Sequence, residues 1–141
     1  MSKGDRIRYR AGYKYWLVND YQVQTIIRPT HDVVTEFIRL SREGLLWIRH
    51  GYAWDGCSGP TFDSRNTMRA GLVHDALYQL MRDGYIESHW RDDADNEFRA
   101  ILLEDGVSKF RSDYFYEGVR LGGGPSAKYG SDGGKPLYEA P

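Results

Sequence analysis

The sequence predicts an α+β fold. An N-terminal antiparallel β-meander is followed by two antiparallel helices carrying the candidate site, a third helical segment and an extended glycine-rich C-terminal arm. Aromatic and β-branched residues between turn formers dominate the first half, and apolar residues at helical spacing dominate the second. A length of 141 residues with 40% hydrophobic residues suits one domain around one core. We expect this domain over residues 1–121, with a β-rich part (1–52), a site loop (53–66) and a helical part (67–121).

The β-rich part contains runs of aromatic and β-branched residues that predict strands. Asn19-Asp20, between the first two runs, is typical of a hairpin turn. The turn formers at 41–44 separate the last two runs. The predicted strands are 13–18, 21–27, 33–40 and 45–48. The stretch that follows, 51–60, mixes large aromatics with glycine and proline, and therefore predicts an ordered loop.

Helical periodicity begins at about residue 67. Two stripes of apolar residues predict helices over 67–82 and 91–103, which end at Asp83-Gly84 and Asp105-Gly106. The first stripe consists of Val73, Ala76, Leu77 and Leu80, and the second of Ala94, Phe98, Ile101 and Leu102. A third helical segment is expected over 108–119, with Phe110, Tyr114 and Val119 partly buried.

Composition and charge restrict the classes of partner. The net charge of −1 gives no bulk attraction to nucleic acid, so no nucleic-acid partner is expected. One cysteine cannot form an internal disulfide. The N-terminus predicts neither a signal peptide nor a membrane-spanning segment, so we expect synthesis in a cytoplasm. Residues 122–141 hold six glycines and three prolines, which predicts an extended arm that is flexible or lies against a neighbour.

A His-Asp pair on the first predicted helix is the centre of the candidate site. His74 and Tyr78 fall on one stripe, whereas Asp75 projects about 100° away from His74. The two neighbours must therefore face different partners, one suited to handling protons and the other to a cation. If the two helices pack antiparallel, Asp95 on the second helix can reach His74 and fix its tautomer, and Tyr78 can donate to Asp95. A second pair, His31-Asp32, is expected at the surface.

The loop before this helix offers ligands for a cation. A tight loop containing Gly56 and Gly59 can direct several backbone carbonyl groups inward. Carbonyl oxygens together with one carboxylate are hard ligands that suit calcium. Asp75 is the candidate for that carboxylate.

In this order, the three elements resemble the phospholipase A2 superfamily, in particular its compact bacterial and parvoviral members. The elements are the loop Trp54-Asp55-Gly56-Cys57-Ser58-Gly59-Pro60, the helix motif His74-Asp75-Ala76-Leu77-Tyr78 and the helix motif Ala94-Asp95-Asn96-Glu97-Phe98. The chain also resembles a family of uncharacterised phage and prophage proteins with a D-G-x-S-x-P loop and H-D-x-L-Y and A-D-x-x-F helices. This closer resemblance covers roughly residues 10–120.

The phospholipase resemblance implies a role for each matching residue. His74 would be the general base that activates water, and Asp95 with Tyr78 would orient it. Asp75 would bind calcium together with the carbonyl oxygens of Trp54, Gly56 and Ser58, and the substrate would be a phospholipid at a membrane surface. The loop departs from the usual pattern, since it lacks the double glycine and the chain lacks the disulfide framework.

The sequence also allows other functions. A non-enzymatic virion protein, such as a tail or capsid accessory protein, would keep the helix pair as a scaffold and bind other virion subunits or itself through residues 122–141. Cys57 with His74 would suit a cysteine hydrolase. Ser58 does not lie in a G-x-S-x-G elbow, because Pro60 takes the place of the second glycine. A metal phosphohydrolase would require a helical bundle with more histidine ligands, which the β-rich first half argues against.

Overall fold

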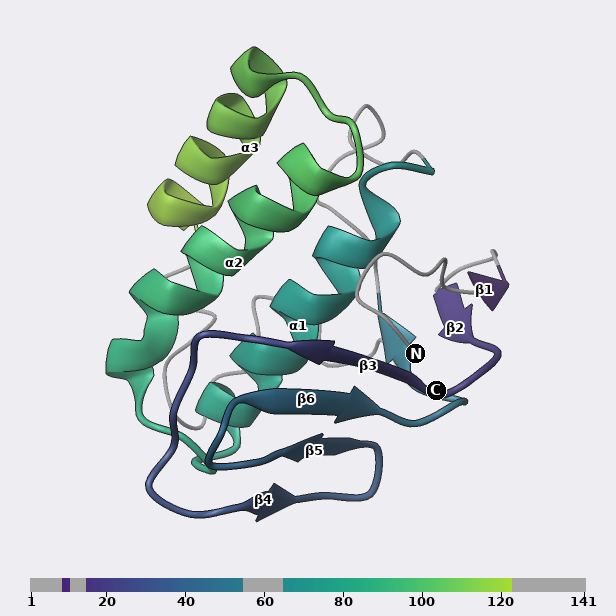
Figure 1. Ribbon diagram of the computed structural model, residues 1–141, viewed down its shortest axis with the longest axis vertical. Coiled ribbons are helices and arrows are strands. Elements are labelled where there is room, and N and C mark those ends of the chain that lie inside the picture. Colours follow the sequence, from purple (N-terminus) through teal and green to yellow (C-terminus); the bar gives the residue numbers. More distant parts are fainter. Residues whose placement is uncertain (1–8, 11–14, 55–64, 123–141) are drawn as a thin grey trace.

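The computed structural model describes residues 9–10, 15–54 and 65–122, which form two antiparallel sheets followed by three helices (Figure 1). The predicted α+β class, with antiparallel strands first and helices second, is confirmed. The strands are β1 (Tyr9–Arg10), β2 (Tyr15–Leu17), β3 (Tyr21–Gln24), β4 (Val33–Val34), β5 (Ile38–Leu40), β6 (Leu45–Ile48) and β7 (Ala53–Trp54). The helices are α1 (Met68–Arg82), the short 3₁₀ helix η1 (Ser88–Trp90), α2 (Arg91–Glu104) and α3 (Lys109–Gly122).

The strands divide between two sheets, ordered β1-β2-β7 and β3-β6-β5-β4. In the larger sheet Tyr21 and Ile38 both lie opposite Ile48, on β3 and β5 either side of β6. The hairpin predicted at Asn19-Asp20 is therefore wrong, because β2 pairs with β1 and β7 while β3 pairs with β6. A turn-forming dipeptide reverses the chain, but it does not decide whether the flanking strands pair with each other.

The run at 33–40, predicted as one strand, forms the two short strands β4 and β5. Thr35 accounts for the break. Its hydroxyl accepts a hydrogen bond from the Ile38 N–H at 3.0 Å and donates one to the Ile38 carbonyl at 2.9 Å. Threonine often competes with a strand ladder in this way. β7 was also missed, since it lies within the stretch predicted as a loop.

The turn predicted at 41–44 is confirmed. The Gly44 N–H donates to the Ser41 carbonyl at 2.9 Å, and Gly44 adopts a φ of 91°. Glycine is required here for space as well, because a Cβ at this position would lie 2.6 Å from the carbonyl oxygen of Thr25 and 2.7 Å from that of Ile27.

The three helices begin and end close to the predicted residues. Gly84 and Gly106 adopt positive φ two residues after the last residues of α1 and α2, as expected of glycines that end helices. Both predicted apolar stripes are buried. On α3, however, Phe110 and Tyr114 are 81% and 59% exposed, so their predicted partial burial is wrong. None of the helices in the described ranges combines the length and apolar character needed to span a membrane.

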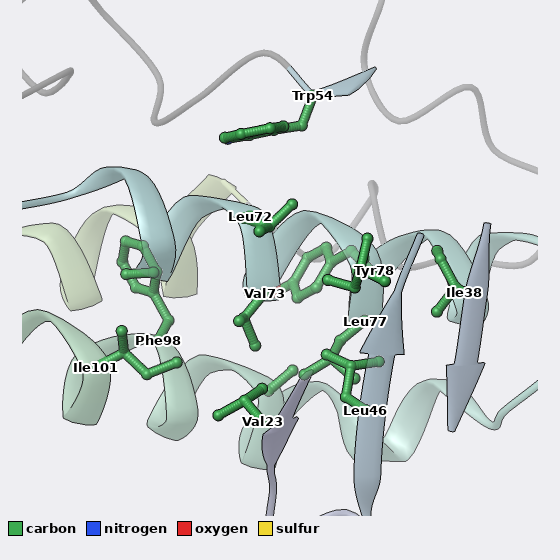
Figure 2. Packing of buried hydrophobic residues seen from close by; sticks show 14 of the residues in the cluster. Val23, Ile38, Leu46, Trp54, Leu72, Val73, Leu77, Tyr78, Phe98 and Ile101 are labelled. Carbon is green, nitrogen blue, oxygen red and sulfur yellow. The ribbon is translucent and has the colours of Figure 1, made fainter. Parts of the chain in front are cut away.

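A single apolar core joins the larger sheet to the helices. Figure 2 shows Val23 and Leu46 of the sheet facing Val73 and Leu77 of α1. Trp54 lies on the other side of α1, where Leu72 is directed toward it (Figure 2). α1 is therefore enclosed on two sides, which accounts for the complete burial of most of its apolar residues.

A buried arginine joins the start of α1 to the end of α2. Arg69 is only 4% exposed and donates to Asp105 through Nε at 3.0 Å and Nη2 at 2.8 Å, to Glu104, and to the Tyr21 hydroxyl at 2.8 Å. Because residue 69 meets residues 104 and 105 while residues 74 and 78 meet residue 95, the two helices run antiparallel, as predicted. Burial raises the pKa of the Tyr21 phenol, against the opposing effect of the Arg69 guanidinium.

Candidate functional site

His74, Tyr78 and Asp95 lie together between α1 and α2. The His74 Nε2 is 2.7 Å from Asp95 Oδ1, and the Tyr78 hydroxyl donates to the same oxygen at 2.7 Å. All three side chains are buried, with Asp95 having no exposed surface and His74 retaining 8% exposure. The contact predicted between His74 and Asp95 is therefore present.

Helical geometry explains why these three residues meet. His74 and Tyr78 are one turn apart on α1, so their rings lie side by side with centroids 4.1 Å apart. Phe98, one turn beyond Asp95 on α2, also contacts the imidazole, with ring centroids 4.9 Å apart. The ring is thus held by two aromatic neighbours and one hydrogen bond, which fixes its orientation. Because Nε2 faces Asp95, the second ring nitrogen, Nδ1, is left for another partner.

Asp95 remains ionised despite its burial. Burial alone raises the pKa of a carboxyl group, but hydrogen bonds from His74, Tyr78 and Arg120 together lower the pKa of Asp95 below its ordinary value. The pKa of the neighbouring Tyr78 phenol shifts in the opposite direction. Burial, followed by its hydrogen bond to the Asp95 carboxylate, raises the pKa of Tyr78, so this phenol stays protonated and serves as a donor.

Two arginines complete the surroundings of Asp95, and sequence reasoning missed both. Arg120 Nη1 donates to Asp95 Oδ2 at 2.8 Å, and Arg91 Nε lies 3.8 Å from the same oxygen. Arg91 Nε also donates to the Tyr78 hydroxyl at 3.2 Å. The spacing of Arg91, four residues before Asp95 on one helix face, was a usable signal. For Arg120 no such signal exists, because its contact depends on how α3 packs.

The other predicted residues are only partly within the described ranges. Asp75 on α1 is half-buried. It follows by three residues Leu72, whose side chain is directed toward Trp54 (Figure 2). Gly56, Ser58 and Cys57 lie outside the described residues, so the predicted ordered loop is described only up to Trp54. His31 and Asp32 are both exposed, as expected.

A family model described as "Protein of unknown function (DUF1353)" matches residues 32–119, which is more than half of the 141 residues. The chain belongs to this family. No curated protein and no solved structure matches the chain. The DUF1353 segment contains the larger sheet from β4 onward, α1, α2 and most of α3, and therefore includes His74, Asp75, Tyr78, Arg91 and Asp95. Arg120 lies one residue beyond it.

This arrangement in the DUF1353 chain is suited to moving a proton. A buried carboxylate on one imidazole nitrogen fixes the tautomer and stabilises the ring when it becomes charged, while the other nitrogen acts as the base. Within the described part of the chain, no group of three or more His, Cys, Asp or Glu side chains is placed to hold a metal ion.

Proposed function

We propose that this protein hydrolyses ester bonds of phospholipids with a phospholipase A2-like, calcium-dependent site. The observation that carries the proposal is the 2.7 Å contact between His74 Nε2 and the fully buried Asp95. It supports a general base because it leaves Nδ1 to accept a proton. The resemblance of the three sequence elements to phospholipases A2 supplies the reaction class.

The side chains would share the work of one proton transfer. His74 Nδ1 would take a proton from water as the water oxygen attacks the ester carbonyl carbon, and would later return it to the departing alcohol oxygen. Asp95 would stabilise the imidazolium that forms between these steps. Tyr78 would hold Asp95 in place through its short hydrogen bond.

Calcium would be held by the Asp75 carboxylate and the backbone carbonyl oxygens of Trp54, Gly56 and Ser58. Asp75 lies one helical turn after Leu72, whose side chain is directed toward Trp54, and this spacing is the support for including Asp75 in the set. When bound, calcium would polarise the ester carbonyl and stabilise negative charge on its oxygen.

The test is fatty acid release from mixed phospholipid vesicles, measured with calcium and with chelator. We expect release that requires calcium, disappears in His74→Gln and is strongly reduced in Asp75→Asn. His31→Gln is the matched control, since it replaces an exposed histidine that also precedes an aspartate, and it should retain full activity. A well-folded protein that releases no fatty acid under either condition would contradict the proposal.

We further propose that the protein acts in a phage context, where a lipase would attack an envelope during entry or exit. The resemblance to phage and prophage proteins supports this setting. Loss of particle assembly after deletion of residues 122–141, with no effect of His74→Gln, would favour the structural virion role instead.

A further inference from the structure

Two arginines join the end of α3 to the start of α2, one reaching from α3 to α2 and the other from α2 to α3. Arg120 on α3 reaches α2, where Nη1 binds Asp95 Oδ2 and Nη2 binds Asp92 Oδ1, both at 2.8 Å. Arg91 on α2 reaches α3, where Nη2 donates to the backbone carbonyl oxygens of Val119, at 3.3 Å, and Arg120. Both parts of Arg120 are therefore bound to α2, the backbone carbonyl through Arg91 and the guanidinium through Asp92 and Asp95.

The contact with Arg120 changes how firmly Asp95 is oriented. Oδ1 receives its donors from α1, whereas Oδ2 receives its donor from α3. The last torsion of an aspartate side chain is broad and roughly two-fold, so contacts at one oxygen alone fix the plane of the carboxylate poorly. Because Asp95 has no exposed surface in the folded protein, its carboxylate oxygens depend on these protein donors.

The charges around Asp95 favour an orienting role as well. His74 and Tyr78 contact it from α1, Arg91 from α2 and Arg120 from α3, and the exposed Asp92 binds the same Arg120 guanidinium. The guanidinium of Arg120 balances the buried carboxylate, so charge compensation does not have to come from His74.

We propose that Arg120 is a positioning residue of the candidate site: by holding Asp95 Oδ2, it keeps Oδ1 directed at His74 Nε2 and so maintains the tautomer with Nδ1 unprotonated. The link to catalysis rests on the proposed function, whereas the effect on the imidazole does not. The simpler possibility is that Arg120 only docks α3 onto α2.

The chain offers a matched control for docking. Arg99 on α2 binds Asp113 on α3 through Nε at 2.6 Å, and so joins the same two helices away from Asp95. Its side chain is 35% exposed, close to the 28% of Arg120. Arg99→Gln therefore removes a comparable contact between α2 and α3 without touching the candidate site.

The experiment compares full-length wild type with Arg120→Gln, Arg120→Lys, Asp92→Asn and Arg99→Gln. The His74 tautomer is read from long-range ¹H–¹⁵N correlations of the imidazole, assigned with His74→Gln, and kcat and KM come from phospholipid vesicles with calcium. In Arg120→Gln we expect a mixture of tautomers and about a tenfold lower kcat with little change in KM. Arg120→Lys should restore part of both, and Arg99→Gln should resemble wild type. If Arg120→Gln does not fold, Asp92→Asn, which loosens the guanidinium from a carboxylate that is 73% exposed, should show the same changes to a smaller extent.

Each result decides for or against the positioning role. A wild-type tautomer in Arg120→Gln, or equal effects of Arg120→Gln and Arg99→Gln, would overturn it. A wild type that releases no fatty acid but shows the tautomer change in Arg120→Gln would contradict the proposed function and leave the positioning role supported.

Discussion

His74 and Tyr78 share one oxygen of Asp95, each at 2.7 Å. We expect Tyr78→Phe to lower the free energy of unfolding by about 2 kcal/mol, because it removes a hydrogen bond to a buried charged group. Tyr52→Phe is the control, since it removes a 3.1 Å bond to the neutral amide of Gln79 and should cost about 1 kcal/mol. Urea unfolding measures both. Equal losses in the two variants would contradict the importance of the charged partner.

The Arg69 contacts predict a large difference between two aspartates that follow helices. Asp105→Asn should destabilise the protein by about 3 kcal/mol. The change removes the negative charge that Arg69 contacts at 2.8 Å, and the Arg69 side chain is only 4% exposed. Asp83→Asn is the matched change, at the residue after α1 and also before a glycine of positive φ. It should change stability by less than about 0.5 kcal/mol. Thermal unfolding with similar losses for both would show that Arg69 is not the cause.

Acid should weaken the native state through Asp95. Although burial opposes it, hydrogen bonds from His74 and Tyr78 lower the pKa of Asp95, whereas an aspartate in the unfolded chain titrates near pH ~3.9. The stabilisation is therefore complete above that pH and is lost as the pH falls through the lower native pKa. The difference in unfolding free energy between wild type and Asp95→Asn should narrow below about pH 4.

The control for this pH dependence is Asp113→Asn. Hydrogen bonds from Lys109 and Arg99 lower the pKa of Asp113, but its side chain is 40% exposed, in contrast to that of Asp95. Added salt should therefore abolish the pH-dependent stability difference between wild type and Asp113→Asn, and should leave the difference between wild type and Asp95→Asn largely intact. If the difference in unfolding free energy between wild type and Asp95→Asn stays constant from pH 7 to pH 3, the ionised state of Asp95 is not the source of that difference.

Two glycines with nearly equal φ allow the cost of backbone strain to be compared with the cost of steric overlap. Gly44 and Gly106 have φ values of 91° and 96°, but a Cβ at Gly44 would meet two carbonyl oxygens within 2.7 Å, whereas one at Gly106 would meet nothing within 4 Å. Gly106→Ala should therefore cost about 1 kcal/mol, and Gly44→Ala about 3 kcal/mol or more. Similar melting temperatures for the two variants would contradict this difference.

The sequence was sufficient for the helices and for the centre of the site because both depend on local spacing. The stripe around Leu77 determined the buried face of α1, and the distance from His74 to Tyr78 placed both on a second stripe. The short connection to α2 then implied the antiparallel packing that brings Asp95 to them.

Features that depend on distant packing were not predictable in this way. Strand pairing is one, since the partner of β3 lies beyond two other strands at β6. The contact of Arg120 with Asp95 is another, because it depends on how α3 lies on α2. Phe110 was expected to be partly buried because it is apolar, but α3 buries a narrow face, represented by Ser112 and Phe115.

The polar contacts at the two ends of the α1–α2 pair also determine how far one helix can slide along the other. A displacement by one turn, about 5.4 Å, would still place apolar residues against apolar residues along much of the stripe. It would, however, separate Arg69 from Asp105 and Asp95 from His74 at the same time, so that one buried charged group on each helix would lose its contacts from the other helix. Apolar burial thus supplies the attraction between the helices, and the charges at their ends select a single alignment.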